Sequence, residues 1–206
     1  MHDQRHFYEP RLGHGLAHDP FNSIVAPRPI GWVSSRDADG ALNLAPYSFF
    51  NAFNYHPPIV GFSSIGYKDS VHNMTTTGVF CWSLATRSLA EAMNQTSAGV
   101  TPDVDEFQLA GLTPRASQVI DVPHVTESPV SFECKVTQII QLNDASGTAL
   151  DTHVVFGEVV GVHIETDLID DGVYNTVAAQ PILRGGGPGD YFTISEAARF
   201  RMTRPQ

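Results

Sequence analysis

The sequence is poor in cysteine and has no long hydrophobic run. Its two cysteines, Cys81 and Cys134, are too few for a disulfide framework and lack CxxC spacing, so we interpret both as packed thiols in a reducing compartment. No apolar run approaches the roughly 18 residues of a membrane span, and the N-terminus lacks the apolar core of a signal peptide. We therefore expect a cytoplasmic protein with no membrane contact.

Positive charge is scarce as well. Lysine and arginine total 12 against 22 aspartate and glutamate residues, which gives a formal net charge of −10. This balance makes attraction to a polyanionic nucleic acid unfavourable. Hydrophobic residues nonetheless make up 42% of the 206 residues, enough for a folded chain, and this length favours one main domain. We therefore predict a globular protein with no nucleic-acid partner.

Common catalytic motifs are also missing. Residues 61–66 (GFSSIG) do not form a GxSxG nucleophile elbow, because the second glycine comes one residue late. Residues 185–189 (GGGPG) lack GxGxxG spacing, and proline cannot donate an N–H to a pyrophosphate. These absences argue against a serine hydrolase and against a Rossmann-type nucleotide site.

Histidines are present in number but not in a metal-binding motif. Two pairs among the nine have the i, i+4 spacing that places side chains on one helical face, His2 with His6 and His14 with His18. Glycines beside the second pair disfavour a helix there, and no HExxH motif occurs. We interpret these histidines as surface or packing residues and predict no metal site.

Turn and strand signals dominate the first third of the chain. Residues 1–20 hold prolines and glycines without a sustained period, which predicts an irregular N-terminal arm. Strands are predicted at 30–35, 42–53 and 59–63, with a hairpin turn at 36–40. The short connections favour an antiparallel meander.

Short helices are predicted in the middle of the chain. Asp69 is expected to cap a helix that runs to about residue 76 and ends at Gly78. A strand at 79–84 follows it. Amphipathic spacing predicts further helices at 88–97 and 104–110.

Two long strands are predicted in the second half. Residues 131–142 alternate between apolar and polar side chains, which indicates a strand with one solvated face. Residues 152–164 are apolar on both alternations, as in a central strand buried on both faces. Gly157 and Gly161 permit bulges there, which closing a barrel requires. The pattern predicts a mainly β fold with accessory helices.

Several segments together resemble one known family. They are PRPIGWVSS at 27–35, NLAPYSFFN at 43–51, KDS at 68–70, EAMNQTSA at 91–98, DEFQLAGLT at 105–113, ESP at 127–129 and FGEVVG at 156–161. The series is similar to the flavin reductase-like family, the FMN-binding split-barrel flavoproteins, over about residues 20–204. The resemblance implies an antiparallel Greek-key split β-barrel, here in a domain of residues 21–206.

A bound FMN needs cations and N–H donors for its phosphate. Lys68 precedes the predicted helix and offers an ammonium, Ser70 offers a hydroxyl, and the helix start offers the positive end of its dipole. The same residues would also suit an ordinary solvated helix start. The resemblance assigns Lys68 and Ser70 to the phosphate, with Asn73 as a further candidate.

The isoalloxazine ring needs an apolar slot with polar groups at its rim. Aromatic residues in these strands would also suit an ordinary barrel core. The resemblance places ring contacts on the first two strands, with Ser48 and Asn51 as the main polar contacts. The candidate cofactor-binding residues of these strands are Trp32, Val33, Ser34, Ala45, Ser48, Phe49, Phe50 and Asn51.

Residues near the two ends of the chain are further candidates. LRGGGPGDY at 183–191 resembles the closing segment of the family, although its glycine tract is longer. If the segment aligns, Asp190 and Tyr191 lie beside the flavin. His14 either approaches the cofactor or is an arm histidine without such a role.

The resemblance implies an NAD(P)H-dependent flavin reductase-type oxidoreductase. In such an enzyme the flavin N5 accepts hydride, so no side chain need be a nucleophile. The resemblance also implies FMN in preference to FAD, and a homodimer with flavin at the subunit boundary. Two other classes remain open: a noncatalytic flavin-binding electron carrier, and a cofactor-free β-barrel interaction protein.

Overall fold

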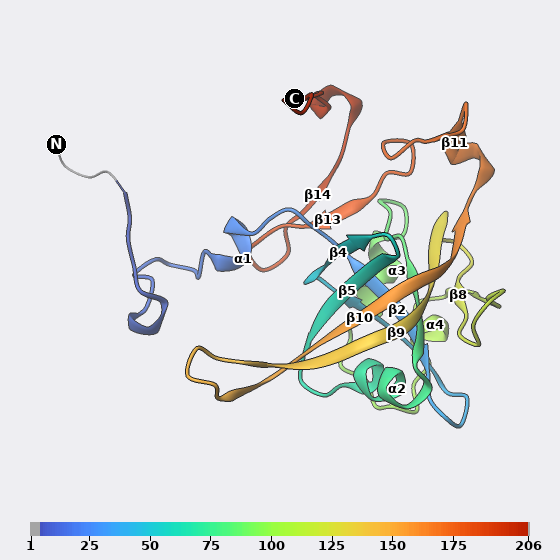
Figure 1. Cartoon of the computed structure of the whole chain (residues 1–206), viewed down its shortest axis with the longest axis horizontal. Coiled ribbons are helices and arrows are strands. Elements are labelled where there is room, and N and C mark those ends of the chain that lie inside the picture. The colour runs from blue at the N-terminus through green and yellow to red at the C-terminus, as the bar shows by residue number, and fades with distance from the viewer. Residues whose placement is uncertain (1–4, 206) are drawn as a thin grey trace.

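A computed structural model describes residues 5–205 and shows a curled β-sheet with short helices around it (Figure 1). The first four residues, with His2 of the predicted His2–His6 pair, lie outside the described residues, as does Gln206. No helix in the described part of the chain is long and apolar enough to cross a bilayer.

Seven antiparallel strands form the main sheet, in the order β3-β2-β6-β9-β10-β5-β4. This confirms the predicted mainly β class. The strands are β2 (Gly31–Arg36), β3 (Leu42–Tyr47), β4 (Phe50–Tyr55), β5 (Pro58–Ile65), β6 (Val79–Ser83), β9 (Val130–Asn143) and β10 (Ala149–Ile164).

The predicted single strand at 42–53 is wrong, because the structure divides it into β3 and β4. The two halves lie at opposite edges of the main sheet, and only Ser48 and Phe49 connect them. Within residues 5–205 no ladder pairs β3 with β4. The N–H of Ser63 donates to the Phe49 carbonyl at 2.9 Å, which fixes the connection to β5. The sheet thus curls into a barrel that is split at this linker.

β9 and β10 confirm the positions of the two long predicted strands, but the predicted burial of residues 152–164 on both faces is wrong, because Val155 is buried while Val162 is 55% exposed. The two strands form a twisted ribbon that extends well beyond the barrel, drawn in yellow and orange in Figure 1. The register shifts next to Gly157 and Gly161, as predicted for bulges. A Cβ at Gly157 would lie 2.4 Å from Cε1 of the buried Phe80, so this strand needs glycine to pass the barrel core.

The helices are short, and one predicted cap is wrong. The longest, α2 (Asp69–Thr77), begins at the predicted cap residue itself, so Lys68 and not Asp69 occupies the N-cap position. Gly78 ends α2 in the left-handed conformation, as predicted. The other α-helices are α1 (Phe21–Ile24), α3 (Ala90–Gln95) and α4 (Glu106–Leu109).

Small elements complete the fold. In residues 5–20 the described structure is an exposed arm with one short 3₁₀ turn, as expected for that segment. A three-stranded sheet places β1 beside the C-terminal part of the chain. The small elements are β1 (Arg28–Pro29), β13 (Ile182–Arg184), β14 (Tyr191–Thr193), β7 (Pro114–Arg115), β8 (His124–Val125), β11 (Ile169–Asp170), β12 (Val173–Tyr174), η1 (Pro10–Leu12), η2 (Thr166–Leu168) and η3 (Glu196–Ala198).

Two apolar cores lie on either side of β2. Val33 faces the barrel interior, where Phe62 and Phe80 are buried. Its neighbour Trp32 faces the other core, which includes Phe107. Because successive side chains of a strand point to opposite faces, β2 is buried on both sides.

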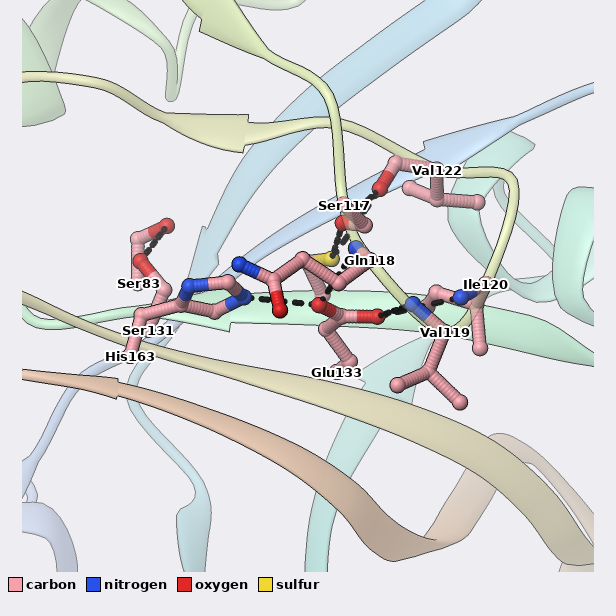
Figure 2. A network of polar contacts seen from close by, with 10 residues as sticks. Ser83, Ser117, Gln118, Val119, Ile120, Val122, Ser131, Glu133 and His163 are labelled. Carbon is pink, nitrogen blue, oxygen red and sulfur yellow. Dashed lines mark hydrogen bonds and ion pairs between the residues drawn. The ribbon is translucent and has the colours of Figure 1, made fainter.

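A buried carboxylate holds the 117–122 segment against the barrel (Figure 2). Glu133 of β9 is fully buried, and it accepts hydrogen bonds from the N–H groups of Gln118 at 2.8 Å, Val119 at 2.7 Å and Ile120 at 3.0 Å. Nε2 of His163 lies 2.6 Å from the same carboxylate. Burial by itself raises the pKa of Glu133, but these contacts outweigh burial and lower the pKa to about 2.

This contact predicts a pH-dependent stability. Because the folded-state pKa of Glu133 is about 2 and its ordinary value 4.5, its carboxylate stabilises the fold fully above about pH 4.5 and loses that effect as the pH falls towards 2. We expect E133Q to lower the free energy of unfolding at pH 7 by about 1–3 kcal/mol. The deficit should shrink as the pH falls.

Urea unfolding of both proteins between pH 7 and pH 3 measures this deficit. The control is D121N, which changes an acid of the same segment whose side chain is 89% exposed, and it should differ little from the wild type. A deficit of E133Q that stays constant across this pH range would contradict the assignment.

Candidate functional site

The start of helix α2 faces a hollow beside strand β3. The hollow has a volume of about 450 Å³ and is lined by Lys68, Ser70, the edge of β3 and the segment 96–102. Ala45, a predicted ring contact, also lines it. Within the described chain no side chain caps α2, so its first N–H groups point outward without a capping partner.

This donor set fits a phosphate. Lys68 is exposed and supplies an ammonium, while the uncapped helix start supplies main-chain N–H donors and the positive end of its dipole. The side chain of Ser70 is only 1% exposed and belongs to the second position of the helix. The sequence-predicted pair Lys68 and Ser70 is therefore brought together at one hollow.

A polar network supports the floor of this hollow. Ser70 Oγ donates to Asn43 Oδ1 at 2.6 Å, and Asn43 Nδ2 donates to Glu106 Oε1 at 3.1 Å. The other oxygen of Glu106 accepts from the N–H of Leu44 at 3.0 Å. Asn73, a further predicted phosphate contact, is buried about one helical turn after Ser70. It donates to Ser35 Oγ at 3.2 Å, and Ser35 donates to Asn43, which links Asn73 to the same network.

Glu106 and Tyr47 are site residues that the sequence analysis missed. Burial raises the pKa of Glu106, whose side chain lines the hollow at 6% exposure. Burial likewise raises the pKa of the Tyr47 phenol, which lies beside the hydroxyls of Ser70 and Ser64. A signal for Glu106 was present in the DEFQLAGLT segment, although its partner Leu44 is 62 residues away.

A second, apolar groove lies on the other side of the Ser48 linker. It has a volume of about 770 Å³, and its lining includes the predicted residues Phe49, Phe50 and Asn51. Further aromatic side chains, among them Phe53 and Phe156, form its walls. The groove offers a broad apolar surface with a carboxamide at its rim, which is the chemistry that a planar aromatic ring requires.

Ser48 lies in the linker between β3 and β4 and is not among the residues that line either hollow. Its carbonyl accepts a hydrogen bond from Nε of Arg28 at 2.9 Å, and the Arg28 guanidinium packs over the Phe49 ring at 5.3 Å. Arg28 is therefore a third residue that the sequence analysis missed, and it holds the linker in place.

Trp32, Val33 and Ser34 are placed differently from the other predicted ring contacts. All three are fully buried, and their side chains line neither of the two hollows. Trp32 Nε1 donates to Thr96 Oγ1 at 3.0 Å, and Ser34 Oγ donates to the Pro123 carbonyl at 2.6 Å. Val33 packs in the barrel core and Trp32 in the second core, on the two faces of β2.

The candidates near the chain ends lie away from the first hollow. The carbonyl of His14 contacts Nε2 of His6 at 2.7 Å within the N-terminal arm. Tyr191 packs against Arg184, and the carbonyl of Asp190 accepts from Arg184 Nη1 at 2.8 Å. In residues 5–205 there is no group of three His, Cys, Asp or Glu side chains able to hold a metal ion.

Comparison with known proteins identifies the fold and the family. A sequence model described as flavin reductase like domain matches residues 24–182. An uncharacterised protein of Aquifex aeolicus is 38% identical over 170 residues, which cover 80% of this chain and 83% of the relative.

Solved structures agree with this match. Nitrilotriacetate monooxygenase component B from Bacillus cereus superposes with a TM-score of 0.81 at 30% identity, covering 91% of this chain and 98% of that one. The 2-nitrobenzoate 2-nitroreductase NbaA from Pseudomonas fluorescens superposes with a TM-score of 0.78 at 30% identity, covering 90% and 88%. The chain belongs to the flavin reductase-like family of split-barrel flavoproteins.

Proposed function

We propose that this protein is an FMN-dependent oxidoreductase that takes hydride from NADH or NADPH. The observation that carries the proposal is the uncapped start of α2 with Lys68 beside it, at the edge of the split barrel. A family of flavin-binding oxidoreductases supports the same chemistry. When bound, the flavin supplies the N5 atom that accepts hydride.

In this proposal Lys68, the N–H groups of α2 and the hydroxyl of Ser70 hold the phosphate. Ser70 carries one hydroxyl hydrogen and gives it to Asn43 in the structure, so donation to phosphate would require that hydrogen to turn away from Asn43. Asn43 would keep its contact with Ser35. Asn73 acts through this network and not by direct contact.

The ring is proposed to lie along the Ser48 linker. Phe49 and Phe50 offer apolar surface and exclude water, while Asn51 offers a carboxamide at the rim. Ser48, the other predicted polar contact, precedes Phe49 in the linker and is proposed to contact the ring edge from there. Ala45 leaves space between this linker and the phosphate hollow. Trp32, Val33 and Ser34 act through β2, which pairs with β3 and is buried on both faces.

Two observations favour FMN as the cofactor and reduction as the type of reaction. FMN is proposed in preference to FAD because the sequence resembles the FMN-binding split-barrel flavoproteins. A reductive reaction is favoured by NbaA, which is named as a nitroreductase and is 30% identical to this chain.

We also propose a homodimer. Apolar side chains around the groove are exposed, including Phe21 at 58%, Ile24 at 69% and Phe53 at 57%. Contiguous apolar surface of this kind marks an interface more often than a free surface. A second copy of the chain would cover these side chains and close the groove over a flavin.

The first prediction concerns the phosphate. We expect Lys68→Ala to remove a charge-assisted contact of roughly 1.5–3 kcal/mol and to weaken FMN binding about tenfold or more, measured by fluorescence titration. Lys135→Ala is the matched control, because Lys135 is the other lysine of the sequence and lies exposed on β9. Equal affinity in the two variants would remove Lys68 from the site.

The second prediction concerns hydride transfer. The FMN-loaded protein should lose its absorbance near 450 nm rapidly when NADH or NADPH is added without oxygen, because reduction interrupts the conjugation of the flavin ring. Bleaching only after addition of a separate protein reductase would indicate an electron carrier instead. A wild-type protein that binds no FMN would indicate a cofactor-free barrel.

The third prediction concerns assembly. Sedimentation equilibrium should give about twice the chain mass of 22.4 kDa, and Phe53→Asp should raise the dimer dissociation constant at least tenfold by placing a charge in the apolar contact. Phe200→Asp is the control, since that side chain is 80% exposed and lies outside the groove. A monomeric wild type at micromolar concentration would contradict the dimer.

A further inference from the structure

Arg28, which lines the apolar groove, lies opposite a second arginine, Arg184. Arg28 of β1 and Arg184 of β13 are register partners in the three-stranded sheet. Arg28 is only 8% exposed. Each guanidinium packs over an aromatic ring, Arg28 over Phe49 at 5.3 Å and Arg184 over Tyr191 at 5.2 Å. The pair concentrates positive charge in a chain whose formal net charge is −10.

All hydrogen bonds of Arg28 go to main-chain carbonyls. Nε donates to Ser48 at 2.9 Å, Nη1 donates to Asn22 at 2.5 Å and to Val25, and Nη2 donates to Gly185 at 3.2 Å. The side chain therefore ties the linker of the split barrel to the N-terminal segment and to the glycine-rich loop.

Arg184 is held in the same way. Its Nη1 donates to the carbonyls of Gly186 at 3.0 Å and Asp190 at 2.8 Å, and its Nη2 donates to Gly187 at 2.9 Å. Asp190 thus presents its carbonyl to this arginine. Among residues 5–205 no carboxylate forms an ion pair with Arg28 or Arg184.

This arrangement leaves the positive charge uncompensated. Burial, and then the charge of Arg184, lower the pKa of Arg28, and like charges at opposed positions of a sheet are destabilising. Carbonyl dipoles satisfy the N–H groups but do not neutralise the charge. A neutral side chain could donate hydrogen bonds to these carbonyls without the cost of burying a charge. The presence of a charged side chain here therefore requires an explanation.

The charge faces the proposed ring site. Arg28 lines the same groove as Phe49, Phe50 and Asn51. We propose that the Arg28–Arg184 pair sets the reduction potential of the bound flavin by stabilising the negative charge that the ring gains on reduction. This inference rests on the proposed function.

The charge balance of that step is simple. Hydride from the reduced nicotinamide, which leaves as oxidised nicotinamide, brings two electrons and one proton to the ring. The ring therefore gains one negative charge until a second proton arrives from solvent. Fixed positive charge in a groove of low dielectric favours this product over the oxidised ring.

The test is the midpoint potential of the FMN-loaded protein, measured without oxygen against a reference dye. We expect Arg28→Met to lower the equilibrium constant for two-electron reduction at least tenfold, which is a potential about 30 mV more negative. By the thermodynamic cycle, the ratio of the dissociation constants for reduced and oxidised FMN should rise by the same factor. Binding titrations measure this ratio independently of turnover.

Three variants separate charge from hydrogen bonding. Arg28→Lys keeps the charge and should stay within threefold of the wild-type equilibrium constant. Arg184→Met should shift it at least threefold in the same direction as Arg28→Met, and it serves as the test if Arg28→Met does not fold. Arg36→Met is the control, because the Arg36 charge is paired with Asp121 at 3.0 Å and should not affect the potential.

The outcomes are distinct. If the wild type binds FMN but Arg28→Met and Arg184→Met keep its potential, the electrostatic role is overturned while the proposed function stands. An equal shift in Arg28→Lys and Arg28→Met would also overturn it, since hydrogen bonding and not charge would then set the potential. A wild type that binds no FMN overturns both the inference and the proposed function.

Discussion

The site depends on one constraint of the fold, which is that the two edge strands of the main sheet are consecutive in sequence. β3 and β4 meet only through Ser48 and Phe49, so no ladder can satisfy the backbone there. Arg28 satisfies the Ser48 carbonyl, and the Ser63 N–H satisfies that of Phe49. The split thus leaves an irregular, well-anchored backbone, with the phosphate hollow on one side of it and the apolar groove on the other.

Local patterns predicted much of the fold, and non-local pairing decided the rest. Alternation over 131–142 and the bulge glycines of β10 describe each strand by its own residues, so they could be identified from sequence. The break at Ser48 could not be identified in this way, because residues 42–53 were predicted as one strand. It follows from the pairing of β4 with β5, which only the closed barrel reveals.

The same distinction applies to the candidate site. The family resemblance assigned Lys68 and Ser70, and the helix start that positions them is adjacent in sequence. Arg28 was not predicted, since Gly185, whose carbonyl it contacts, is 157 residues away in the sequence. Burial of Trp32 was also hidden, because its second core is built by the distant segment around Phe107. An apolar strand residue has the same sequence signature whether it faces a ligand or a core.

Because positive charge is scarce in this chain, the few lysine and arginine side chains near the linker determine the local charge there. A net charge of −10 opposes anionic ligands at long range, but salt screens charges beyond about 8 Å. Close to the linker the charge balance is local. Lys68 lies at the start of α2, Arg28 lines the apolar groove, and Arg184 is the register partner of Arg28. Glu106 lines the same hollow as Lys68, and its oxygens accept from Asn43 and Leu44. In the proposed site, a few fixed cations therefore provide the local positive charge for an anionic ligand.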